Sequence, residues 1–461
     1  MKTWNQLFVR HGWILVEKED GVFDCTNERN ENVNFLIQSL EKVNVRYTFE
    51  KGVLSLFSPV VREDQFLSAI DYKNRGRGEG LWFNPSNEQS KVHELDTFIS
   101  GIVRQLNRLG FATLGSCDGH GKRPAHLMVN KEKSMEELAE LLLALGCKRV
   151  YYRERQNSYH VSIHLARHEL LDLAEKLSEV EKSWLEQGYD FIKQQLFNHL
   201  LEQLLAIPGT SGQEAQVRKF VSEKLTPFVD HITVDRAGNI LAEKTYKSGN
   251  GPVLLMNAHL DTVFEIEPGR QIIKNGNMWS SSKGILGADD RAGVAVLLHL
   301  AEYLSHPSSF SGKVKFIFTV QEECGLVGAS EVDNYFLWGT DAAIVIDRRG
   351  AGDIVTSCGG YLPFCHPRYG AFIEEVAQKE AFKGWATTSG GSSDTRIWAE
   401  HGIQSVNLSA GYMNEHTDQE TLNVDACYNT AKLVQGLLKN EKNLKAVLRE
   451  IKREQQVLVK N

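Results

Sequence analysis

The residues of this chain best suited to chemistry are histidines and carboxylates in five short segments of its last two-thirds. The segments are Asn257–Asp261, Gly287–Gly293, Gln321–Gly325, Ile346–Asp347 and Asn414–Thr417. Zinc in proteins prefers imidazole nitrogen and carboxylate oxygen, and a catalytic zinc site keeps one position for water. Each segment has an ordinary alternative when it is taken alone. All five in this order predict a two-metal hydrolytic centre.

The first two segments could hold and bridge metal ions. In an extended stretch His259 and Asp261 lie on one face, so His259 can bind metal while Asp261 accepts its other ring proton. Asp289 and Asp290 lie between glycines at the entrance to an expected helix. A carboxylate there can bridge two cations about 3.5–4 Å apart. The ordinary alternative is a helix cap.

The later segments supply further carboxylates and a second histidine. Glu322 and Glu323 follow an apolar run, and the pair suits a division of labour in which one carboxylate binds metal and its neighbour acts as base. A solvated turn is the alternative. Asp347 ends the run Ala342–Ile346, where an isolated carboxylate would be costly without a cation or hydrogen-bond partners. His416 lies in a polar loop and is unremarkable by itself.

Apolar runs that alternate with helical stretches must position these segments. The expected strands are Ile232–Val234, Val253–Ala258, Val314–Val320, Ala342–Ile346 and Ser405–Leu408, and the expected helices are Glu214–Lys224, Ala292–Leu304 and Ala426–Leu438. Nearly continuous apolar strands separated by helices predict an α/β fold with a mostly parallel sheet covered on both faces. Ligands gather beyond the carboxyl ends of such strands, and His259, Glu322 and Asp347 follow three of them.

Together the motifs resemble the co-catalytic zinc exopeptidases of families M20 and M28, the clan of peptidase T, glutamate carboxypeptidases and bacterial leucyl aminopeptidases. The likeness covers about residues 195–440 and includes three further landmarks of the clan, namely Leu204–Glu214, Asp235–Asn239 and Gly390–Asp394. It implies the zinc exopeptidase, or phosphorylase/hydrolase-like, fold.

The resemblance implies a ligand set for two Zn²⁺ ions per chain. One ion would be held by His259, Asp289 and Asp347, and the other by Asp289, Glu323 and His416. The peptide bond after Asp289 is expected to be cis. Carboxylate-rich sites also accept Co²⁺ or Mn²⁺, so these ions are alternatives.

The resemblance also implies the mechanism. Glu322 would be the general base, taking a proton from a metal-activated water and passing it to the leaving amine, and Asp261 would support His259. We expect a metal-dependent exopeptidase, in the first place an aminopeptidase. A dipeptidase or an N-acyl amino acid amidohydrolase is the alternative, so the substrate would be a peptide or an acylated amino acid.

One departure from the family pattern leaves substrate contacts unassigned. Many M20 enzymes insert a lid and dimerisation domain between the ligands that match Asp347 and His416, and this lid lends an oxyanion-stabilising histidine and a carboxylate-binding arginine. Here residues 348–415, 68 in number, are too few for that domain and the sheet elements as well. The candidates for these contacts are Tyr361, His366, Arg396 and Tyr412.

A domain boundary is expected near residue 190. Residues 1–190 would form an α+β accessory domain of unknown function, and residues 191–461 the catalytic domain without a full-length lid. Helices are expected at Leu95–Asn107, Leu170–Leu185 and Phe191–Leu205, and Arg75–Gly80 is expected to be a flexible loop. We hypothesise that the N-terminal domain replaces the lid, by covering the active site or by pairing subunits as a homo-oligomer.

The N-terminal part carries a weaker chemical signal. Cys117 and His120 could form half a metal site, with more ligands among His126, His160, His164 and His168. The favoured alternative is a half-buried sheet, in which alternation along Tyr159–Leu165 gives one polar face. The Ser-Cys-x-Gly pattern at Cys117 is faintly similar to tRNA wybutosine methyltransferase-like proteins, from which no activity follows.

Composition limits the remaining classes. The 461 residues are 42% hydrophobic and 24% charged, as in soluble globular proteins, and the net charge of −7 favours neither nucleic acid nor membrane as a partner. An N-terminal domain that binds RNA or a nucleotide remains the alternative from a different class. Seven scattered cysteines favour a reduced, cytoplasmic setting, although Cys358 and Cys365 are close enough for a local bridge.

Overall fold

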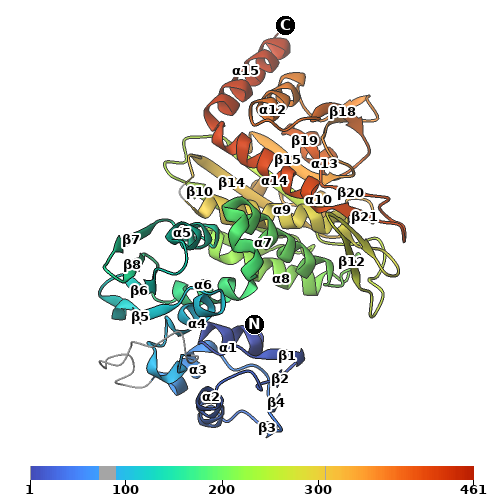
Figure 1. The fold of residues 1–461 in the computed structure, drawn as a ribbon. Helices are drawn as coiled ribbons and strands as arrows, with labels where there is room; N and C mark the ends of the chain where they lie inside the picture. The colour runs from blue at the N-terminus through green and yellow to red at the C-terminus, as the bar shows by residue number, and fades with distance from the viewer. Residues whose placement is uncertain (1, 72–89, 307, 461) are drawn as a thin grey trace. The chain divides into compact units, whose positions relative to one another are not determined.

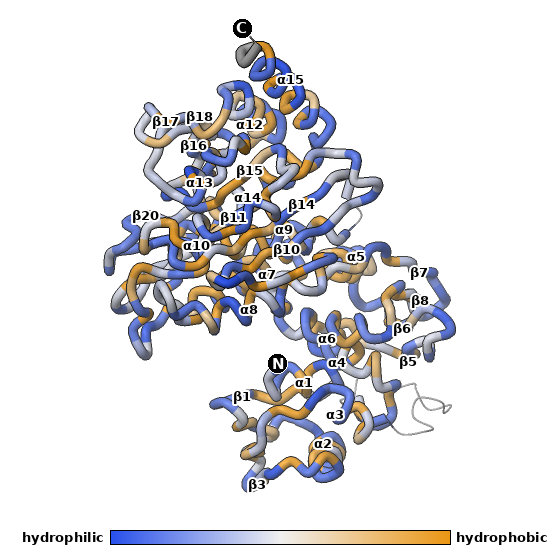
Figure 2. The backbone as a smooth tube through the Cα atoms, turned by 180° about the vertical axis from the view of Figure 1, so that it is seen from behind, coloured by the Kyte–Doolittle hydropathy of each residue, from blue (hydrophilic) through white to orange (hydrophobic). Residues whose placement is uncertain are grey.

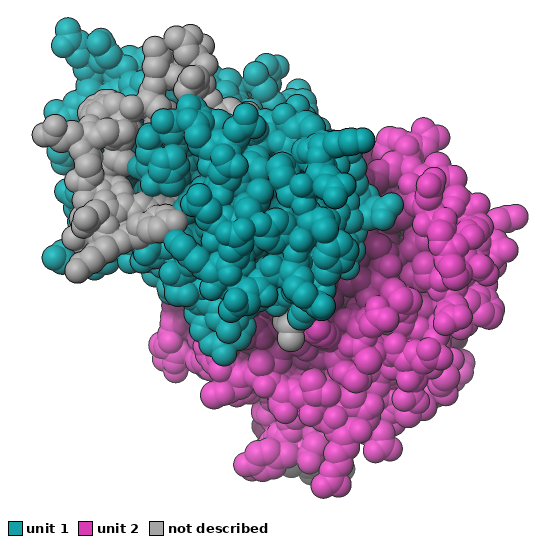
Figure 3. Space-filling model, turned by 90° about the horizontal axis from the view of Figure 1, so that it is seen from below, with its two compact units in different colours: residues 1–196 teal, residues 197–461 magenta. Residues whose placement is uncertain are grey.

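The computed structural model describes residues 2–71, 90–306 and 308–460. The chain divides into two units, Met1–Leu196 and Phe197–Asn461 (Figure 3). The Arg75–Gly80 loop lies outside the described residues. Within the described ranges, no helix combines the length and apolar character needed to cross a membrane. The cysteines are free, so no disulfide joins Cys358 and Cys365.

The first unit is α+β, as predicted, with two four-stranded antiparallel sheets (Figure 1). One sheet has the order β1-β2-β4-β3, and the other β5-β6-β8-β7. The strands are β1 (Val16–Glu19), β2 (Val22–Asp24), β3 (Tyr47–Glu50), β4 (Val53–Leu56), β5 (Thr113–Cys117), β6 (Ala125–Asn130), β7 (Val150–Glu154) and β8 (Ser158–Ile163). The helices are α1 (Trp4–Arg10), α2 (Asn30–Lys42), α3 (Glu63–Ile70), α4 (Ser100–Arg108), α5 (Met135–Ala144), α6 (Glu169–Glu179) and α7 (Gly188–Leu205), the last of which crosses the division between the units.

Two expected helices of this unit are shorter than predicted. The helix expected at Leu170–Leu185 ends at Glu179, and a separate 3₁₀ turn follows at Lys182–Gln187. The Arg108 guanidinium donates to the carbonyl oxygens of Leu177 and Val180, so a tertiary contact satisfies the end of α6. The helix expected from Leu95 begins only at Ser100.

The second unit is built on a nine-stranded sheet. Its order is β17-β16-β19-β15-β11-β14-β10-β9, with β18 beside β16. The four central strands, β19, β15, β11 and β14, are parallel, whereas β10, β9 and β17 pair antiparallel and β16 pairs antiparallel with β19. The strands are β9 (His231–Val234), β10 (Ile240–Tyr246), β11 (Val253–His259), β14 (Gly312–Thr319), β15 (Ala342–Arg348), β16 (Asp353–Cys358), β17 (Leu362–Pro363), β18 (Ala386–Gly390) and β19 (Gln404–Ser409). A small separate sheet contains β12 (Ile272–Asn275), β13 (Met278–Ser281), β20 (Tyr412–Met413) and β21 (Thr421–Asn423).

Helices cover both faces of this sheet. Alternate side chains of its central strands therefore pack into two different hydrophobic cores. Leu254 and Met256 of β11 pack in one core, and Leu255 between them packs in the other. Figure 2 shows the hydrophobic colour along β15. The helices are α8 (Ala215–Leu225), α9 (Ala288–Ser305), α10 (Val327–Ser330), α11 (Asn334–Leu337), α12 (Pro367–Lys379), α13 (Asp394–Glu400), α14 (Val424–Lys439) and α15 (Glu441–Lys460). The predicted α/β class, with central parallel strands between helical layers, is confirmed.

Burial on both faces makes β11 sensitive to the loss of side-chain volume. We expect Leu255→Ala to lower the free energy of unfolding by about 2–5 kcal/mol, because Leu255 is fully buried and its removal leaves a cavity. Denaturant titration of the full chain measures the effect. Val234→Ala on edge strand β9, where the side chain is 47% exposed, is the control and should change stability by about 0.5 kcal/mol at most. Equal losses in the two variants would contradict this core assignment.

Candidate metal centre

The candidate centre lies where three neighbouring parallel strands end. His259 is the last residue of β11, Glu322 and Glu323 follow β14, and Asp347 lies near the end of β15. The strands β15, β11 and β14 are adjacent. Carboxyl ends of parallel strands meet at one edge, so residues far apart in sequence come together there.

His259 is held in an orientation that turns one ring nitrogen toward carboxylates. Its Nδ1 atom lies 3.0 Å from the carbonyl oxygen of Asp261 and 3.4 Å from the carboxylate Oδ1 of the same residue. Both neighbours are acceptors, so a proton on Nδ1 has a partner on this side of the ring. Nε2 faces Asp289 Oδ1 at 3.2 Å and Asp347 Oδ1 at 3.6 Å. The ring nitrogen that remains is therefore aimed at two potential co-ligands.

Asp289 lies between two imidazoles. Its Oδ1 is 3.2 Å from His259 Nε2, and its Oδ2 is 3.2 Å from His416 Nε2. The residue occupies the first turn of α9 with non-helical backbone angles, and the Asp289–Asp290 peptide bond is cis, as the resemblance implies. Each carboxylate oxygen thus belongs to a different half of the cluster, which is the arrangement a bridging ligand requires.

His416 and Glu323 form the other half of the cluster. His416 Nε2 lies 2.9 Å from Glu323 Oε1. This approach does not have hydrogen-bond geometry, and the buried Oε1 atom has no hydrogen-bond donor among the described residues. A cation between the two side chains would satisfy both ligand atoms.

Asp261 supports the surrounding loops as well as His259. Its carboxylate accepts hydrogen bonds from the Ser211 hydroxyl at 2.7 Å and from the backbone amides of Glu322 and Glu323 at 3.0 and 3.2 Å. Burial raises its pKa, but hydrogen bonding and the charge of His259 outweigh burial and lower it to about 2. Asp261 is therefore a fixed negative charge that joins the loops after β11 and β14.

The carboxyl groups of Glu322, Glu323 and Asp347 are buried close to other negative charges, and their pKa values are raised. Burial is the largest cause that raises the pKa of Glu323 to about 7, of Glu322 to about 10, and of Asp347 above its usual range. Burial lowers the pKa of His259, but hydrogen bonds with the carboxylates more than offset it and raise that pKa well above its ordinary value. The cluster has an excess of negative charge in a buried place.

This donor set has the chemistry of a candidate metal site. The described residues include two overlapping groups whose ligand atoms lie within 4.8 Å of one another, His259 with Asp289 and Glu323, and His259 with Asp290 and Asp347. Carboxylate and imidazole are the ligands of zinc in hydrolytic sites. The excess negative charge and the unsatisfied oxygen of Glu323 are what bound cations would neutralise.

Of the four residues predicted to contact the substrate, one lies at the cluster. The Tyr412 hydroxyl donates to Asp347 Oδ1 at 2.9 Å. The contacts described for the other three are elsewhere. Tyr361 is 81% exposed, His366 pairs with Glu454, and Arg396 pairs with Glu400.

Sequence reasoning missed a carboxylate that fixes the Asp289 turn. Glu420 is buried and accepts hydrogen bonds from the backbone amides of Gly287, Ala288 and Asp289 at 2.7, 2.8 and 3.0 Å. These are orphan amides at the start of α9. Glu420 lies 131 residues from Asp289 along the chain, and its place in a polar loop gave no signal of this contact.

Two further buried groups near the site were also missed. Arg291 is fully buried, and its Nε and Nη1 atoms have no hydrogen-bond partner among the described residues. Burial lowers its pKa to about 10, while the charges of Asp261, Asp290 and Glu214 oppose this. Asp394 accepts a hydrogen bond from the Thr319 hydroxyl, and burial raises its pKa to about 7. A basic side chain inside α9 therefore offsets part of the negative charge.

Comparisons with known proteins agree with the motif reading. Residues 239–435, which include all the predicted ligands, match the model of peptidase family M28. A protein of Acetivibrio thermocellus named "Putative aminopeptidase" is 25% identical over 325 residues, which cover 51% of this chain and 96% of that protein. Peptidase T of Geobacillus kaustophilus is 30% identical over 153 residues, 26% of this chain and 37% of the relative.

The solved structure of aminopeptidase PepT from Bacillus cereus has a TM-score of 0.47 and 20% identity, covering 53% of this chain and 98% of that one. For several curated relatives, peptidase T among them, this chain spans about half of their length or less. The match to peptidase family M28 confirms the resemblance to zinc exopeptidases.

The contacts of Glu420 give a testable role to this missed residue. We expect Glu420→Gln to weaken zinc binding by about 10–100-fold, because an outer carboxylate that orients a ligand typically contributes that much. Zinc titration of the full chain against a competing chelator measures the change. Glu265→Gln, which alters an exposed carboxylate, is the control. Unchanged zinc affinity in Glu420→Gln would show that the Asp289 turn holds its shape without this residue.

Proposed function

We propose that this protein, whose residues 239–435 match the model of peptidase family M28, is a metal-dependent exopeptidase that acts as an aminopeptidase. One observation carries the two-metal part of the proposal, namely that the two oxygens of Asp289 face His259 and His416 at equal distances of 3.2 Å. His259, Asp289 and Asp347 would hold one ion, and Asp289, Glu323 and His416 the other. Zinc is the first choice, with Co²⁺ or Mn²⁺ as alternatives.

Bound ions would lower the pKa of a water and polarise the scissile carbonyl. The chain's own part is to hold the ligands, to position Glu322 and to receive the substrate. Asp261 fixes the turn that carries Glu322 and Glu323 through their backbone amides. Tyr412 holds Asp347 by donating its hydroxyl proton, and burial raises the pKa of Tyr412 well above its usual range, so the hydroxyl stays a donor.

Glu322 is the proposed general base. Its side chain is largely enclosed, and burial, together with the charges of Asp347 and Asp394, raises its pKa to about 10 although His259 opposes this. A carboxyl group with this pKa would keep its proton at neutral pH, so the charge of bound cations would have to lower the pKa toward the working pH before Glu322 could take a proton from water. The same side chain then returns the proton to the amine that leaves.

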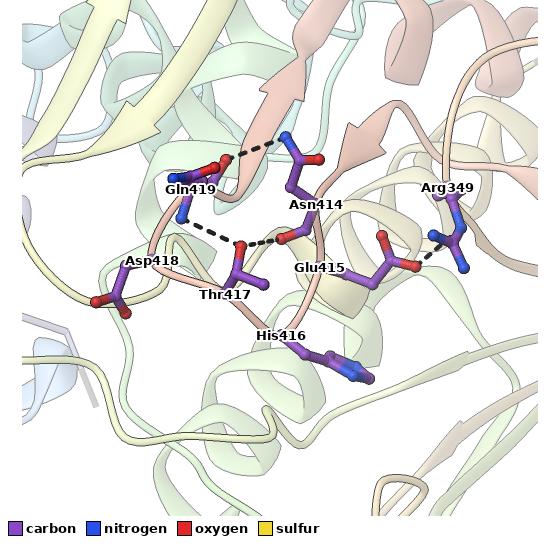
Figure 4. Close-up of a pocket in the computed structure, with 7 residues that line it drawn as sticks. All are labelled: Arg349, Asn414, Glu415, His416, Thr417, Asp418 and Gln419. Carbon is purple, nitrogen blue, oxygen red and sulfur yellow. Dashed lines mark hydrogen bonds and ion pairs between the residues drawn. The ribbon is translucent and has the colours of Figure 1, made fainter.

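A pocket beside His416 supports the recognition of a free amine. It has a volume of about 690 Å³ and is lined by Arg349 and by residues 414–419 (Figure 4). Glu415 pairs through Oε1 with Arg349 at 2.9 Å, while its Oε2 atom is buried and has no hydrogen-bond partner among the described residues. A carboxylate that lines a pocket beside a proposed metal ligand suits a substrate ammonium group.

The proposed activity is tested with peptides whose termini are free or blocked. We expect zinc-loaded protein to cleave peptides with a free amino terminus and to spare acetylated ones. Glu322→Gln should lower kcat by about 10²–10⁴-fold while metal content is kept, since it removes proton transfer. Chelation should abolish cleavage, and added zinc should restore it. Preference for blocked peptides would instead favour the N-acyl amidohydrolase alternative.

The role of Glu415 gives a separate prediction. Glu415→Gln should lower kcat/KM for peptides with a free amino terminus by about tenfold or more, because hydrogen bonds to charged groups contribute about 1.5–3 kcal/mol. Asp418→Asn is the matched control, since Asp418 lines the same pocket and is exposed. Steady-state kinetics of both variants measure the difference. Equal effects in the two variants would remove Glu415 from amine recognition.

The other predictions for the whole protein remain proposals. They are a homo-oligomeric state, a cytoplasmic location, and an accessory role for the N-terminal domain in place of a lid. An RNA-binding or nucleotide-binding N-terminal domain is the second proposal for that part of the chain.

A further inference from the structure

The first unit contains its own cluster of potential metal ligands. Asp96, Cys117, Asp118 and His120 each offer a ligand atom, and these atoms lie within 4.8 Å of one another. Three of the four residues are buried. Sequence analysis considered Cys117 and His120 as half of a site, but the histidines it considered as partners are not in this cluster. His126 and His160 instead stack on each other, with ring centroids 5.0 Å apart.

The backbone brings these residues together from two places. β5 ends at Cys117, and the next residues, Gly119, His120 and Gly121, all have positive φ angles. A left-handed conformation is uncommon for a histidine and marks a position fixed by its surroundings. Asp96 comes from the turn before α4, and its carboxylate accepts a hydrogen bond from the Asp118 backbone amide at 3.1 Å.

The contacts of His120 match those of a metal-binding histidine. Its Nδ1 atom lies 3.2 Å from Asp118 Oδ1, and its Nε2 atom lies 3.8 Å from Asp96 Oδ2. Asp118 is held in turn by Arg167, whose Nε and Nη2 atoms lie 3.0 and 2.7 Å from Oδ2. The carboxylate beside Nδ1 occupies that side of the ring and leaves Nε2, on the Asp96 side, for a metal.

The Cys117 sulfur lies within reach of a backbone amide and of a guanidinium group. The Gly119 backbone amide donates to Sγ at 3.4 Å, and the Arg123 Nη2 atom donates to Sγ at 3.6 Å. A cysteine binds a metal ion through this sulfur atom, as the thiolate. Cys117 is 6% exposed, so this sulfur is a sheltered ligand.

Asp96 provides an independent observation that points to a ligand, because one of its buried carboxylate oxygens is unsatisfied. The residue is 2% exposed, and no described residue makes a hydrogen bond of acceptable geometry to its Oδ1 atom. An unsatisfied buried carboxylate oxygen is costly unless a donor or a cation meets it.

We propose that Asp96, Cys117 and His120 bind one divalent transition-metal ion of the zinc type, with Asp118 orienting the imidazole. The thiolate selects zinc or a similar soft ion over magnesium and calcium. Three protein ligands leave one position of a tetrahedral site for water or a small ligand. The His120 side chain is 32% exposed, so that position is accessible from solvent. This site is independent of the peptidase centre, whose proposed ligands include no sulfur.

Cobalt substitution of the full chain distinguishes the proposed site of the first unit from the peptidase centre, because only the former contains a sulfur ligand. A thiolate bound to Co²⁺ gives a near-ultraviolet charge-transfer band, which carboxylate and imidazole ligands do not give. We expect the band in cobalt-loaded protein, its loss in Cys117→Ser, and its retention in Cys147→Ser, which alters another buried cysteine of the same unit. Metal content measured by mass spectrometry should fall by one ion per chain in Cys117→Ser alone.

His120→Ala provides a second variant at a partly exposed position, in case Cys117→Ser does not fold. We expect at least a tenfold loss of cobalt affinity, measured by titration of the same band, with far-ultraviolet circular dichroism unchanged. The absence of a band in the wild-type protein, a band that survives in Cys117→Ser, or unchanged affinity in His120→Ala would each overturn the proposal.

Discussion

Repulsion among buried carboxylates is the constraint on which the second unit depends. Asp261, Asp289, Asp347 and the pair Glu322 and Glu323 converge at one edge of the sheet, with Asp290 and Asp394 close behind. The protein's own residues offset part of this electrostatic repulsion without any ion. Backbone amides donate hydrogen bonds to Asp261 and Glu420. Arg291 supplies a buried positive charge, and two imidazoles contact Asp289. The remaining negative charge is the property that makes the edge a candidate cation site rather than an ordinary end of a sheet.

The central part of the fold was predictable from the sequence, since its physical signal is local. Strands buried on both faces need continuous apolar runs, so β11, β14, β15 and β19 were found within one or two residues of their ends. The ends of a helix were predicted less well where they depend on a contact with a residue that is distant in sequence. The helix expected at Leu170–Leu185 is divided because Arg108, far away in sequence, donates to its last carbonyls. Nothing within the helical stretch itself signals this contact.

The candidate site follows the same rule. His259, Asp289, Glu323 and Asp347 could be named because each stands beside an apolar run or between glycines, whereas His416 was named through the family resemblance alone. The structure brings all five together. Glu420, Arg291 and Asp394 could not be named. Their function is to hold ligands or to balance charge, and any polar residue in a loop or helix has the same local appearance. Tyr361, His366 and Arg396 were reasonable candidates by residue type, but their described contacts lie elsewhere.

The loop of residues 414–420 has a consequence for how such a protein can diverge. One end of the loop presents His416, and the other end presents Glu420, which holds the backbone of Asp289. Asn414 and His416 both have positive φ angles, and Thr417 and Asn414 close the loop by hydrogen bonds (Figure 4). An insertion or a deletion here would displace two ligands at once, although they belong to segments far apart in the chain. Substitutions that leave the loop length unchanged are therefore the route by which new specificity can arise at this pocket.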